Sequence, residues 1–484
     1  MDSGSVTSRP YDRLVASVFG ESETRLREDT EPFLSVPPTE LELQSRWFAG
    51  DFGRDFTSTC GQAVRIVQFG FWNHSAGPDF SNVVVLLGEN AKRPGAIEID
   101  IDVRNWERHG HSENPAYNDV VLHLFVEAPG RETFYTRTEN HRNVVQVRLD
   151  LESADSARRG LALGGAGVPD ARPGRCAPPL AGMPADAVGQ LLQSAARHRL
   201  EAKARRLRRI AEIHGEREMV YQSVAQALGY RRNKLPMTVL AQRLPLELLR
   251  QSGPRAEALL FGLAGFLETR VFENAAPDTR DYLRGLWETW WKCRAEFQGV
   301  DLGWHLAGAR PVNHPQRRVA ALGAFAAASP KVFQLLAPGA FSRAKLAAIL
   351  ASLEHPYWNR HYTLTSAASS KPLALIGKDR VNDILANIIY PWVAADNPIL
   401  WRDYLSIRGA LENEKSRRAT ARLLGDRDDS AAFTRHLYQQ QALLQIYDDF
   451  CRVDTSDCED CPFPEQLRQW RGDGDGDGDG DCLP

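Results

Sequence analysis

The sequence lacks the features by which membrane and exported proteins are recognised. No apolar run reaches the ~18 residues that a membrane-spanning helix needs. The N-terminal segment carries no basic stretch followed by an apolar stretch and a small-residue cleavage site, as a secretory signal would. We therefore expect a cytoplasmic protein without a membrane partner.

Cysteine and net charge are also low. Seven cysteines among 484 residues make an odd count in a chain without an export signal, so a disulfide framework is not expected. A formal net charge of −3 argues against a protein that coats nucleic acid over its whole surface, and it leaves room for a local basic face. None of these features indicates an oligomeric state.

Several catalytic signatures are missing as well. The sequence has no phosphate-cradling glycine loop, no nucleophile elbow and no HExxH motif. NTPase, serine hydrolase and zincin functions therefore have no support.

The patterning that is present changes character near residue 155. Before it, short segments rich in Val, Ile, Phe and Tyr predict a sheet; after it, apolar residues at three- and four-residue intervals predict helices. We expect an α+β protein in which an N-terminal mixed sheet domain precedes a larger all-α domain. The predicted parts are an N-terminal extension at 1–35, the sheet domain at 36–152, a linker at 153–185, the helical domain at 186–465 and a disordered Gly-Asp tail at 466–484.

A row of carboxylates stands out in the sheet domain. In AIEIDIDV, residues 96–103, alternation predicts isoleucines on one face of a strand and, on the other face, Glu98, Asp100 and Asp102. Like charges so close together destabilise a strand unless they face water or a cation. A solvated acidic edge and a cation site are therefore both open.

Asp79 favours the cation site. It follows Pro78 and opens the preceding predicted strand, FSNVVVLL. If the two strands form a hairpin around GENAKRPG, Asp79 and Glu98 converge, with Asp100 assisting, on a cation such as Mg²⁺ or Mn²⁺ that takes oxygen ligands. Such a cation lowers the pKa of a bound water and neutralises charge on a phosphate.

Several segments resemble a bacterial family. They are GFWNHSAGPDF, GAIEIDIDVRNWERHGH, NPAYNDVVLHLFVE, GYRRNKLP, RPVNHPQRRVAAL, IGKDRVNDILANIIYPW and CEDCPFP. These segments look like the hallmarks of the uncharacterised family catalogued as domain of unknown function 2851, and the resemblance runs from about residue 36 to residue 465. It implies no established activity.

The sheet domain is also similar to the PD-(D/E)XK nuclease superfamily. The similarity implies that Glu40 is the helix acid, Asp79 the motif aspartate and Glu98 the second carboxylate. The lysine that normally follows two residues later is missing, and Asp100 stands in its place. The implied function is metal-dependent cleavage of phosphodiester bonds in DNA or RNA. The missing lysine leaves enzymatic activity uncertain and keeps an alternative open, a catalytically degenerate module that binds nucleic acid or protein.

Histidines follow the acidic strand. WERHGH offers His109 and His111, and VVLHLF offers His123 on the next predicted strand. Imidazoles near carboxylates can serve as general base, ligand or phosphate-binding cation, and His111 is our candidate base. The alternative is a histidine satisfied within the sheet, with Trp106 as a core anchor.

A cysteine cluster lies near the C-terminus. In FCRVDTSDCEDCPFP, Cys451, Cys458 and Cys461 have Cys-x6-Cys-x2-Cys spacing, which lets thiolates share one metal. Cys176, in a Pro-rich loop, is our preferred fourth ligand; the other candidates are Cys60, Cys293, Cys482 and His436. Zinc and an iron–sulfur cluster both fit a structural centre. Three reduced cysteines without a metal are the alternative.

A basic helix is predicted within ARHRLEAKARRLRRIAEIHG. Its basic side chains are Arg197, Arg199, Lys203, Arg205, Arg206, Arg208 and Arg209. Such a face contacts phosphates without reading sequence, so the helix near 197–209 is our candidate surface for DNA or RNA. A solvated helix face is the alternative.

Overall fold

The computed structural model describes most of the chain. The described residues are 10–19, 38–73, 77–88, 91–128, 135–151, 172–230, 232–273, 275–297, 301–306, 309–408, 414–451 and 458–470. The predicted linker up to residue 171 and the predicted disordered tail from residue 471 lie outside them. The described residues fall into two compact units, which we call the sheet unit (within 33–151 and 208–384) and the helical unit (within 1–32, 152–207 and 385–484).

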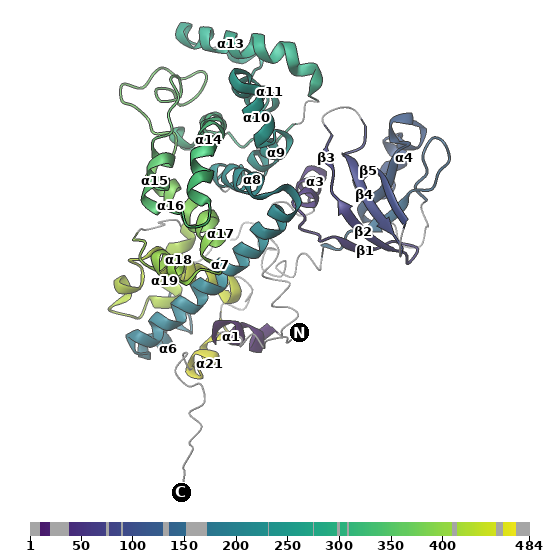
Figure 1. The fold of residues 1–484 in the computed structure, drawn as a ribbon. Helices are drawn as coiled ribbons and strands as arrows, with labels where there is room; N and C mark the ends of the chain where they lie inside the picture. Colours follow the sequence, from purple (N-terminus) through teal and green to yellow (C-terminus); the bar gives the residue numbers. More distant parts are fainter. Residues whose placement is uncertain are drawn as a thin grey trace. The chain divides into compact units, whose positions relative to one another are not determined.

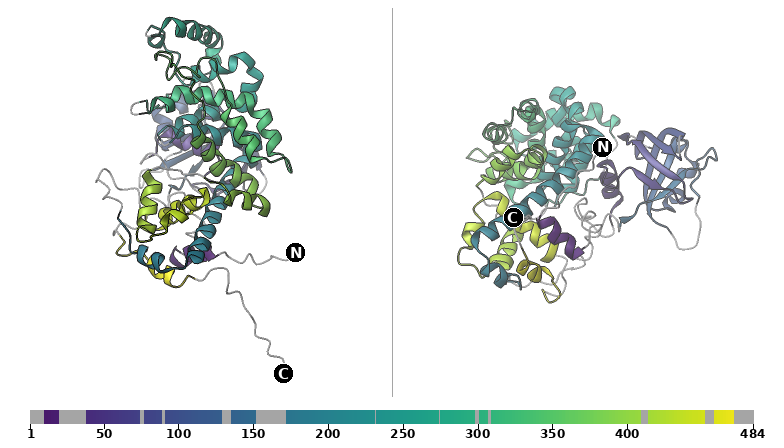
Figure 2. Two further views of the ribbon diagram at one scale, coloured as in Figure 1. Left: turned by 90° about the vertical axis from the view of Figure 1, so that its left-hand side faces the viewer. Right: turned by 60° about the horizontal axis from the view of Figure 1, so that its bottom comes forward.

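One mixed sheet dominates the first part of the sheet unit. Its strands are β1 (Asp55–Thr57), β2 (Ala63–Gln68), β3 (Phe71–Trp72), β4 (Phe80–Leu87), β5 (Ala91–Asp102), β6 (Val120–Glu127) and β7 (Val145–Arg148). The strand order is β1-β2-β4-β5-β6-β7, with β3 paired to β4. Strands β1 to β5 pair antiparallel, whereas β6 runs parallel to β5 and β7 runs parallel to β6. Figure 1 and the right-hand view of Figure 2 show the twist of this sheet.

The connection from β5 to β6 is short. It contains α4 (Asn105–Arg108) and two 3-10 turns, η1 (His111–Glu113) and η2 (Pro115–Tyr117). Gly95 allows β6 to lie close to β5, because a Cβ atom at this position would stand 2.4 Å from the carbonyl oxygen of Asp119. Trp106 and Tyr117 fold back into a buried cluster with Ala96, Val120 and Val144. The connection therefore closes over one face of β5.

Helix α3 (Glu40–Phe48) covers the sheet and joins it to the helices that follow. Thr39 caps its N-terminus by accepting a hydrogen bond from the backbone N–H of Glu42 at 3.2 Å. Its buried apolar side chains include Trp47 and Phe48. The helix contacts both β5 and α9 (Lys234–Arg243), as Figure 1 shows. One face of α3 is thereby directed at the acidic strand.

The rest of the sheet unit is helical. After the C-terminal end of α7 (Ala185–His214) come α8 (Glu216–Leu228), α9, α10 (Leu246–Ser252), α11 (Ala256–Leu263), α12 (Thr269–Glu273), α13 (Pro277–Cys293), α14 (Pro315–Leu336), α15 (Arg343–Ala351) and α16 (Lys378–Ile384), with 3-10 turns at Gly253–Arg255, Arg294–Glu296 and Pro311–Asn313. Pro245 separates α9 from α10, because proline cannot donate a helical hydrogen bond.

Helix α14 is long and apolar enough, by length and composition alone, to cross a membrane. It packs against α8, α10, α11 and α15. Its first turn carries two buried arginines that donate to backbone carbonyls, Arg317 to Ala374 and Arg318 to Leu375. These contacts are those of a core helix of the sheet unit.

The described elements of the helical unit are all helices. They are α1 (Pro10–Phe19), α6 (Ala177–Gly182), α7 up to residue 207, α17 (Tyr390–Ala394), α18 (Pro398–Leu405), α19 (Glu414–Leu424), α20 (Leu437–Ile446) and α21 (Phe463–Arg468), with π-helical turns at Leu385–Ile389 and Tyr447–Cys451 and a 3-10 turn at Ser430–Phe433. Helix α6 packs against α19 and α21. With a mixed sheet followed by a largely helical region, the predicted α+β class is confirmed.

Candidate metal centre

The hairpin of β4 and β5 brings Asp79 to the acidic strand. The two strands pair antiparallel with Phe80 opposite Ile97, so the predicted hairpin is confirmed. The backbone N–H of Asp79 donates to Glu98 Oε2 at 3.0 Å, and the backbone N–H of Ile99 donates to Asp79 Oδ2 at 2.9 Å. Asp79 and Glu98 therefore meet side by side at the end of the hairpin.

Helix α3 adds a third carboxylate through Gln44. The Nε2 atom of Gln44 donates to Glu40 Oε1 at 3.1 Å and to Asp79 Oδ1 at 2.7 Å. Glu40 and Gln44 lie one turn apart, so they share the face of α3 that is directed at the hairpin. Glu40 was predicted from the sequence as a site residue, whereas Gln44 was not. Its position four residues after Glu40, on the same face of the helix, is the pattern that could have indicated it.

Asp100 is the fourth carboxylate and the most deeply buried, with 1% of its surface exposed. Its Oδ2 atom lies 3.1 Å from His123 Nε2, and His123 Nδ1 lies 2.7 Å from Thr136 Oγ1. Because a carboxylate oxygen accepts, His123 Nε2 is assigned as the donor to Asp100, and His123 Nδ1 then accepts from the hydroxyl of Thr136. His123 thus holds one carboxylate oxygen and leaves the other to face the site.

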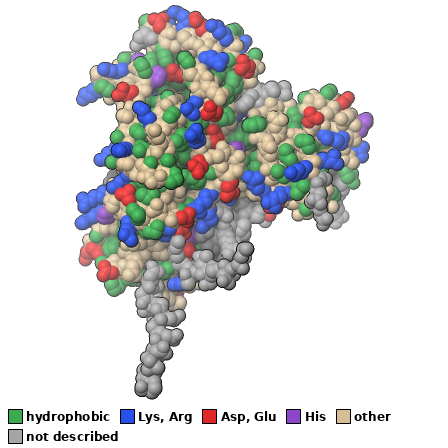
Figure 3. Space-filling view, viewed as in Figure 1, with side chains coloured by type: hydrophobic (Ala, Val, Ile, Leu, Met, Phe, Trp, Pro, Cys, Tyr) green, Lys and Arg blue, Asp and Glu red, His purple; other side chains and the backbone are tan. Residues whose placement is uncertain are grey.

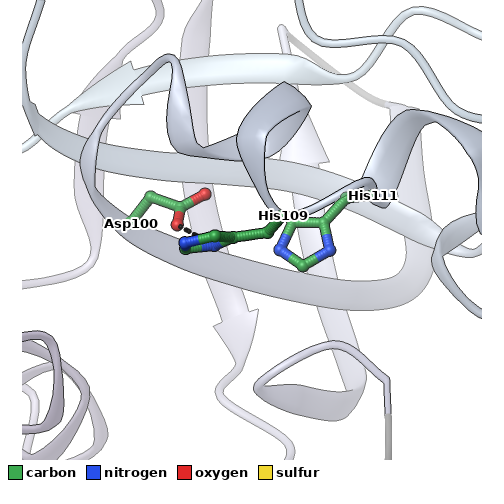
Figure 4. A group of neighbouring side chains, drawn as sticks. All are labelled: Asp100, His109 and His111. Carbon is green, nitrogen blue, oxygen red and sulfur yellow. Dashed lines mark ion pairs between the residues drawn. The ribbon is translucent and has the colours of Figure 1, made fainter.

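Two histidines from the turn after α4 face that second oxygen. His109 Nδ1 lies 3.4 Å from Asp100 Oδ1, and His111 Nε2 lies 3.1 Å from Glu98 Oε1. One ligand atom from each of Asp100, His109 and His111 lies within 4.8 Å of the other two; Figure 4 shows the two rings beside the carboxylate. Among the described residues, Asp100 Oδ1 and His111 Nε2 are buried atoms without a hydrogen-bond partner. These three side chains could hold one cation.

The environment disfavours charge on these carboxylates. Burial, together with the charges of Glu98 and Glu40, raises the pKa of Asp79 well above its usual range. Burial and the neighbouring Asp100 raise the pKa of Glu98 well above its usual range and raise that of Glu40. Burial also lowers the pKa of His111. A bound cation would relieve the repulsion among the carboxylates, because it stabilises their ionised forms.

One cation of the chain lies near the site. Burial lowers the pKa of Arg243, at the C-terminal end of α9, to about 10, and the Asp79 carboxylate acts against this shift. The Nη2 atom of Arg243 donates to the backbone oxygen of Asn73 at 3.4 Å. Arg243 was not predicted as a site residue, because nothing in the local sequence connects it with a hairpin more than a hundred residues upstream.

Asp102 belongs to the same row of acids but has a different environment. Its carboxylate accepts hydrogen bonds from the backbone N–H and the guanidinium of Arg104, at 2.9 and 3.0 Å. These bonds lower the pKa of Asp102. Asp102 is therefore a structural residue at the end of β5. The row as a whole does not form a solvated edge, because all three acids are buried.

The donor set fits a divalent cation that accepts both oxygen and nitrogen ligands. Two imidazoles with a carboxylate suit Mn²⁺, Fe²⁺ or Zn²⁺ better than Mg²⁺, which prefers oxygen. Asp100, His109 and His111 would hold such an ion, with Glu98 next to His111. The hydrogen bond between His123 and Asp100 orients the carboxylate, as outer-shell partners do in metal sites.

The four predicted cysteine ligands lie together in the helical unit. Burial and the other three thiols, those of Cys451, Cys458 and Cys461, raise the pKa of Cys176. Each of the other candidates for the fourth ligand either has another environment or lies outside the described residues. Cys60 is exposed, the Cys293 thiol donates to Thr289 O at 3.3 Å, His436 stands at the N-cap of α20, and Cys482 lies outside the described residues.

The basic residues of α7 make contacts within the chain. Arg197 donates to Glu201 Oε1 at 2.6 Å, Arg199 donates to Gln441 Oε1 at 2.9 Å, and Lys203 donates to the same oxygen at 2.8 Å. The remaining four, Arg205, Arg206, Arg208 and Arg209, also have interaction partners. On the face shown in Figure 3, Lys and Arg side chains are interspersed with Asp and Glu. A role for α7 in binding DNA or RNA stays a prediction.

Comparison with protein families gives one match. Residues 40–400 match the family described as a protein of unknown function (DUF2851). The chain belongs to this family. The match includes Glu40, Asp79, Glu98, Asp100, His109 and His111, and it ends before Cys451. Comparison with curated proteins and with solved structures gave no match.

Proposed function

We propose that this DUF2851 protein is a metal-dependent phosphodiester hydrolase acting on DNA or RNA. The observation that carries the proposal is a pair of buried ligand atoms that make no hydrogen bond, Asp100 Oδ1 and His111 Nε2. Each faces a further polar group, His109 Nδ1 at 3.4 Å and Glu98 Oε1 at 3.1 Å. Leaving such atoms without a partner costs stability unless a ligand satisfies them. The cation would be Mn²⁺ or a similar transition metal, and it would supply an activated water and neutralise charge on a phosphate.

Each carboxylate has a distinct part in this proposal. Asp100 binds the cation and is oriented by His123. Glu98 lies within reach of both His111 and the backbone of Asp79, so it can accept a proton from a water held between them. Asp79 and Glu40, linked by Gln44, complete the negative cluster that attracts the cation.

The arrangement of the elements supports the resemblance to the PD-(D/E)XK superfamily. A helix bearing Glu40 precedes antiparallel strands bearing Asp79 and Glu98, and a parallel strand follows. Asp100 occupies the position of the usual lysine. Arg243, close to Asp79, is our candidate for the phosphate-binding cation that the lysine would otherwise provide.

A nuclease assay tests the proposal. Labelled single- and double-stranded DNA and RNA are incubated with the protein and Mn²⁺, Mg²⁺ or a chelator. We expect cleavage with Mn²⁺, none with chelator, and a loss of roughly 100-fold or more in Glu98→Gln. Asp102→Asn is the matched control, since Asp102 lies on the same strand and binds Arg104 instead. Undiminished cleavage by Glu98→Gln would falsify the assignment of the site.

A second candidate function is a module that binds nucleic acid or protein without cleaving it. The observation in its favour is that both carboxylate oxygens of Asp79 already accept hydrogen bonds, from Gln44 and Ile99. Thermal unfolding separates the two candidates. Stabilisation by Mn²⁺ that disappears in Asp79→Asn supports the enzyme, whereas the absence of any response to Mn²⁺, Mg²⁺ or Zn²⁺ supports the binding module.

A further inference from the structure

We propose that Cys176, Cys451, Cys458 and Cys461 hold an iron–sulfur cluster that joins the C-terminal segment to helix α6. This inference concerns the helical unit alone and does not depend on the proposed nuclease activity. It rests on the gathering of the four cysteines, on their burial, on the spacing of their sulfur atoms and on a cation that contacts one of them.

The four cysteines meet although they come from distant parts of the sequence. Cys176 precedes α6, Cys451 ends the π-helical turn after α20, and Cys458 and Cys461 precede α21. All four are free thiols, and all but Cys451 are buried. Three helices converge here, because α6 packs against both α19 and α21.

Gly174 shows how closely two of the sulfur atoms approach. A Cβ atom at this position would lie 3.4 Å from Cys458 Sγ and 3.5 Å from Cys176 Sγ. The two sulfurs therefore flank one small space, and the lack of a side chain at Gly174 keeps that space open. The backbone N–H of Gly174 donates to the backbone oxygen of Arg422 at 2.9 Å, which fixes the glycine against α19.

Two arginines hold the cysteine turn in place. Arg422 Nη2 donates to Cys458 Sγ at 2.6 Å, so a cation contacts the sulfur atom directly. Arg175 Nη1 donates to the backbone oxygen of Cys458 at 2.8 Å, and Arg175 Nη2 donates to Glu465 Oε1 at 3.1 Å. Cys458 itself has a left-handed backbone with φ of 78°. The bonds from Arg175 and Arg422 hold this residue in a backbone conformation that L-amino acids rarely adopt.

The spacing favours a cluster over a single zinc ion. Thiolates around one Zn²⁺, with Zn–S bonds of about 2.3 Å, would stand roughly 3.8 Å apart. Among the described residues, no three of these four cysteines have sulfur atoms within 4.8 Å of one another. In a four-iron, four-sulfide cluster each thiolate binds a different iron atom of a larger unit, so the sulfurs are more widely separated.

Composition and spectroscopy of the full-length protein test the proposal. Protein purified without oxygen should be brown, absorb near ~400 nm and contain about four iron and four sulfide ions per chain, as a Cys-ligated cubane does. One zinc ion without iron would overturn the iron–sulfur assignment. The absence of both iron and zinc would overturn the metal centre.

Variants locate the cluster. Cys176→Ser should lose most of the iron and the visible absorption, whereas Cys60→Ser, at an exposed cysteine of the sheet unit, should keep both. If Cys176→Ser fails to fold, Arg422→Gln provides a second measurement. It keeps all four ligands but removes a hydrogen bond to sulfur, so the reduction potential should become more negative while the iron content stays the same. An unchanged potential in Arg422→Gln together with normal iron in Cys60→Ser and Cys176→Ser would refute the site.

Discussion

The sheet unit and the helical unit each contain a candidate metal site, and the two sites differ in every ligand. In the sheet unit, carboxylates and imidazoles lie within a short stretch of sequence, from Asp79 to His123, with Glu40 added from α3. In the helical unit, Cys176 meets cysteines that follow it by more than 270 residues. The first site consists of charged and polar oxygen and nitrogen ligands. The second consists of soft sulfur ligands that come together only when the chain folds.

This difference has an energetic consequence. The carboxylates of the sheet unit repel one another, so without a cation they destabilise the fold that carries them. The cysteines, by contrast, come from chain segments far apart in the sequence, so a metal bound there would contribute directly to folding. Removing one ligand should therefore have opposite effects on the stability of the two sites.

The largest effect is expected at the cysteine site. Cys458→Ser should destabilise the helical unit by an amount on the order of several kcal/mol, because the cluster is lost and the turn held by Arg175 no longer has a ligand. Limited proteolysis should then cut the C-terminal segment before any other region. Cys293→Ser, a buried cysteine in α13, is the matched control and should leave the C-terminal segment protected. Equal protection in Cys458→Ser would remove the contrast between the two units.

Asp100→Asn should have the opposite effect on stability. In the presence of a chelator, its unfolding midpoint should match or exceed that of the natural protein, because one charge leaves the repelling cluster and asparagine can still accept from His123. The variant should nevertheless bind Mn²⁺ more weakly, by roughly 100-fold, as measured by calorimetry. Asp102→Asn should bind Mn²⁺ normally. A large destabilisation of Asp100→Asn in chelator would mean that the carboxylate stabilises the fold without a metal.

The same contrast explains which parts of the molecule could be predicted from sequence. The alternation of Ile and acid in β5 and the Pro-Asp step before β4 are local patterns, and they predicted the hairpin and the meeting of Asp79 with Glu98. The ligand position of His109 depends on how the turn after α4 folds, which no periodicity encodes. The position of Arg243 near Asp79 depends on the packing of α9 against α3, which the local sequence does not encode.

Tertiary packing also determines which groups the basic side chains of helix α7 contact. The sequence of α7 shows only that Arg199 and Lys203, four residues apart, share one side of the helix. Their partners come from residues almost two hundred or more positions later, such as Gln441. A basic face in sequence is therefore weaker grounds for a nucleic-acid surface than a row of acids is for a cation site, because arginines are easily satisfied by backbone and amide oxygens.

The pH dependence of stability is the subtlest way to separate the sites. Because the pKa values of Asp79 and Glu98 are raised in the folded state, the folded protein holds extra protons above the ordinary carboxyl pKa of about 4. Their contribution is thus fully present at low pH and is lost as the pH rises through the folded-state pKa values, at about 1.4 kcal/mol per pH unit for each extra proton. His111 acts in the opposite sense below its ordinary pKa of about 6.5, since burial lowers its folded-state pKa.

Above about pH 6.5, therefore, buried carboxylates with raised pKa values set the sign, and metal-free protein should become less stable as the pH rises. Glu218 of α8, whose pKa burial raises to about 7, contributes to this slope with the same sign as Asp79 and Glu98. Mn²⁺ should reverse the trend, because it replaces the protons and binds more tightly as they leave. Denaturant unfolding at several pH values, with chelator and with Mn²⁺, measures both effects. The double variant Asp79→Asn, Glu98→Gln should lose the part of the slope that these two carboxylates contribute, together with the response to Mn²⁺, and should keep the part due to Glu218. A metal-free stability that increases over this range would show that the carboxylates are not the repelling cluster that distinguishes the sheet unit from the helical unit.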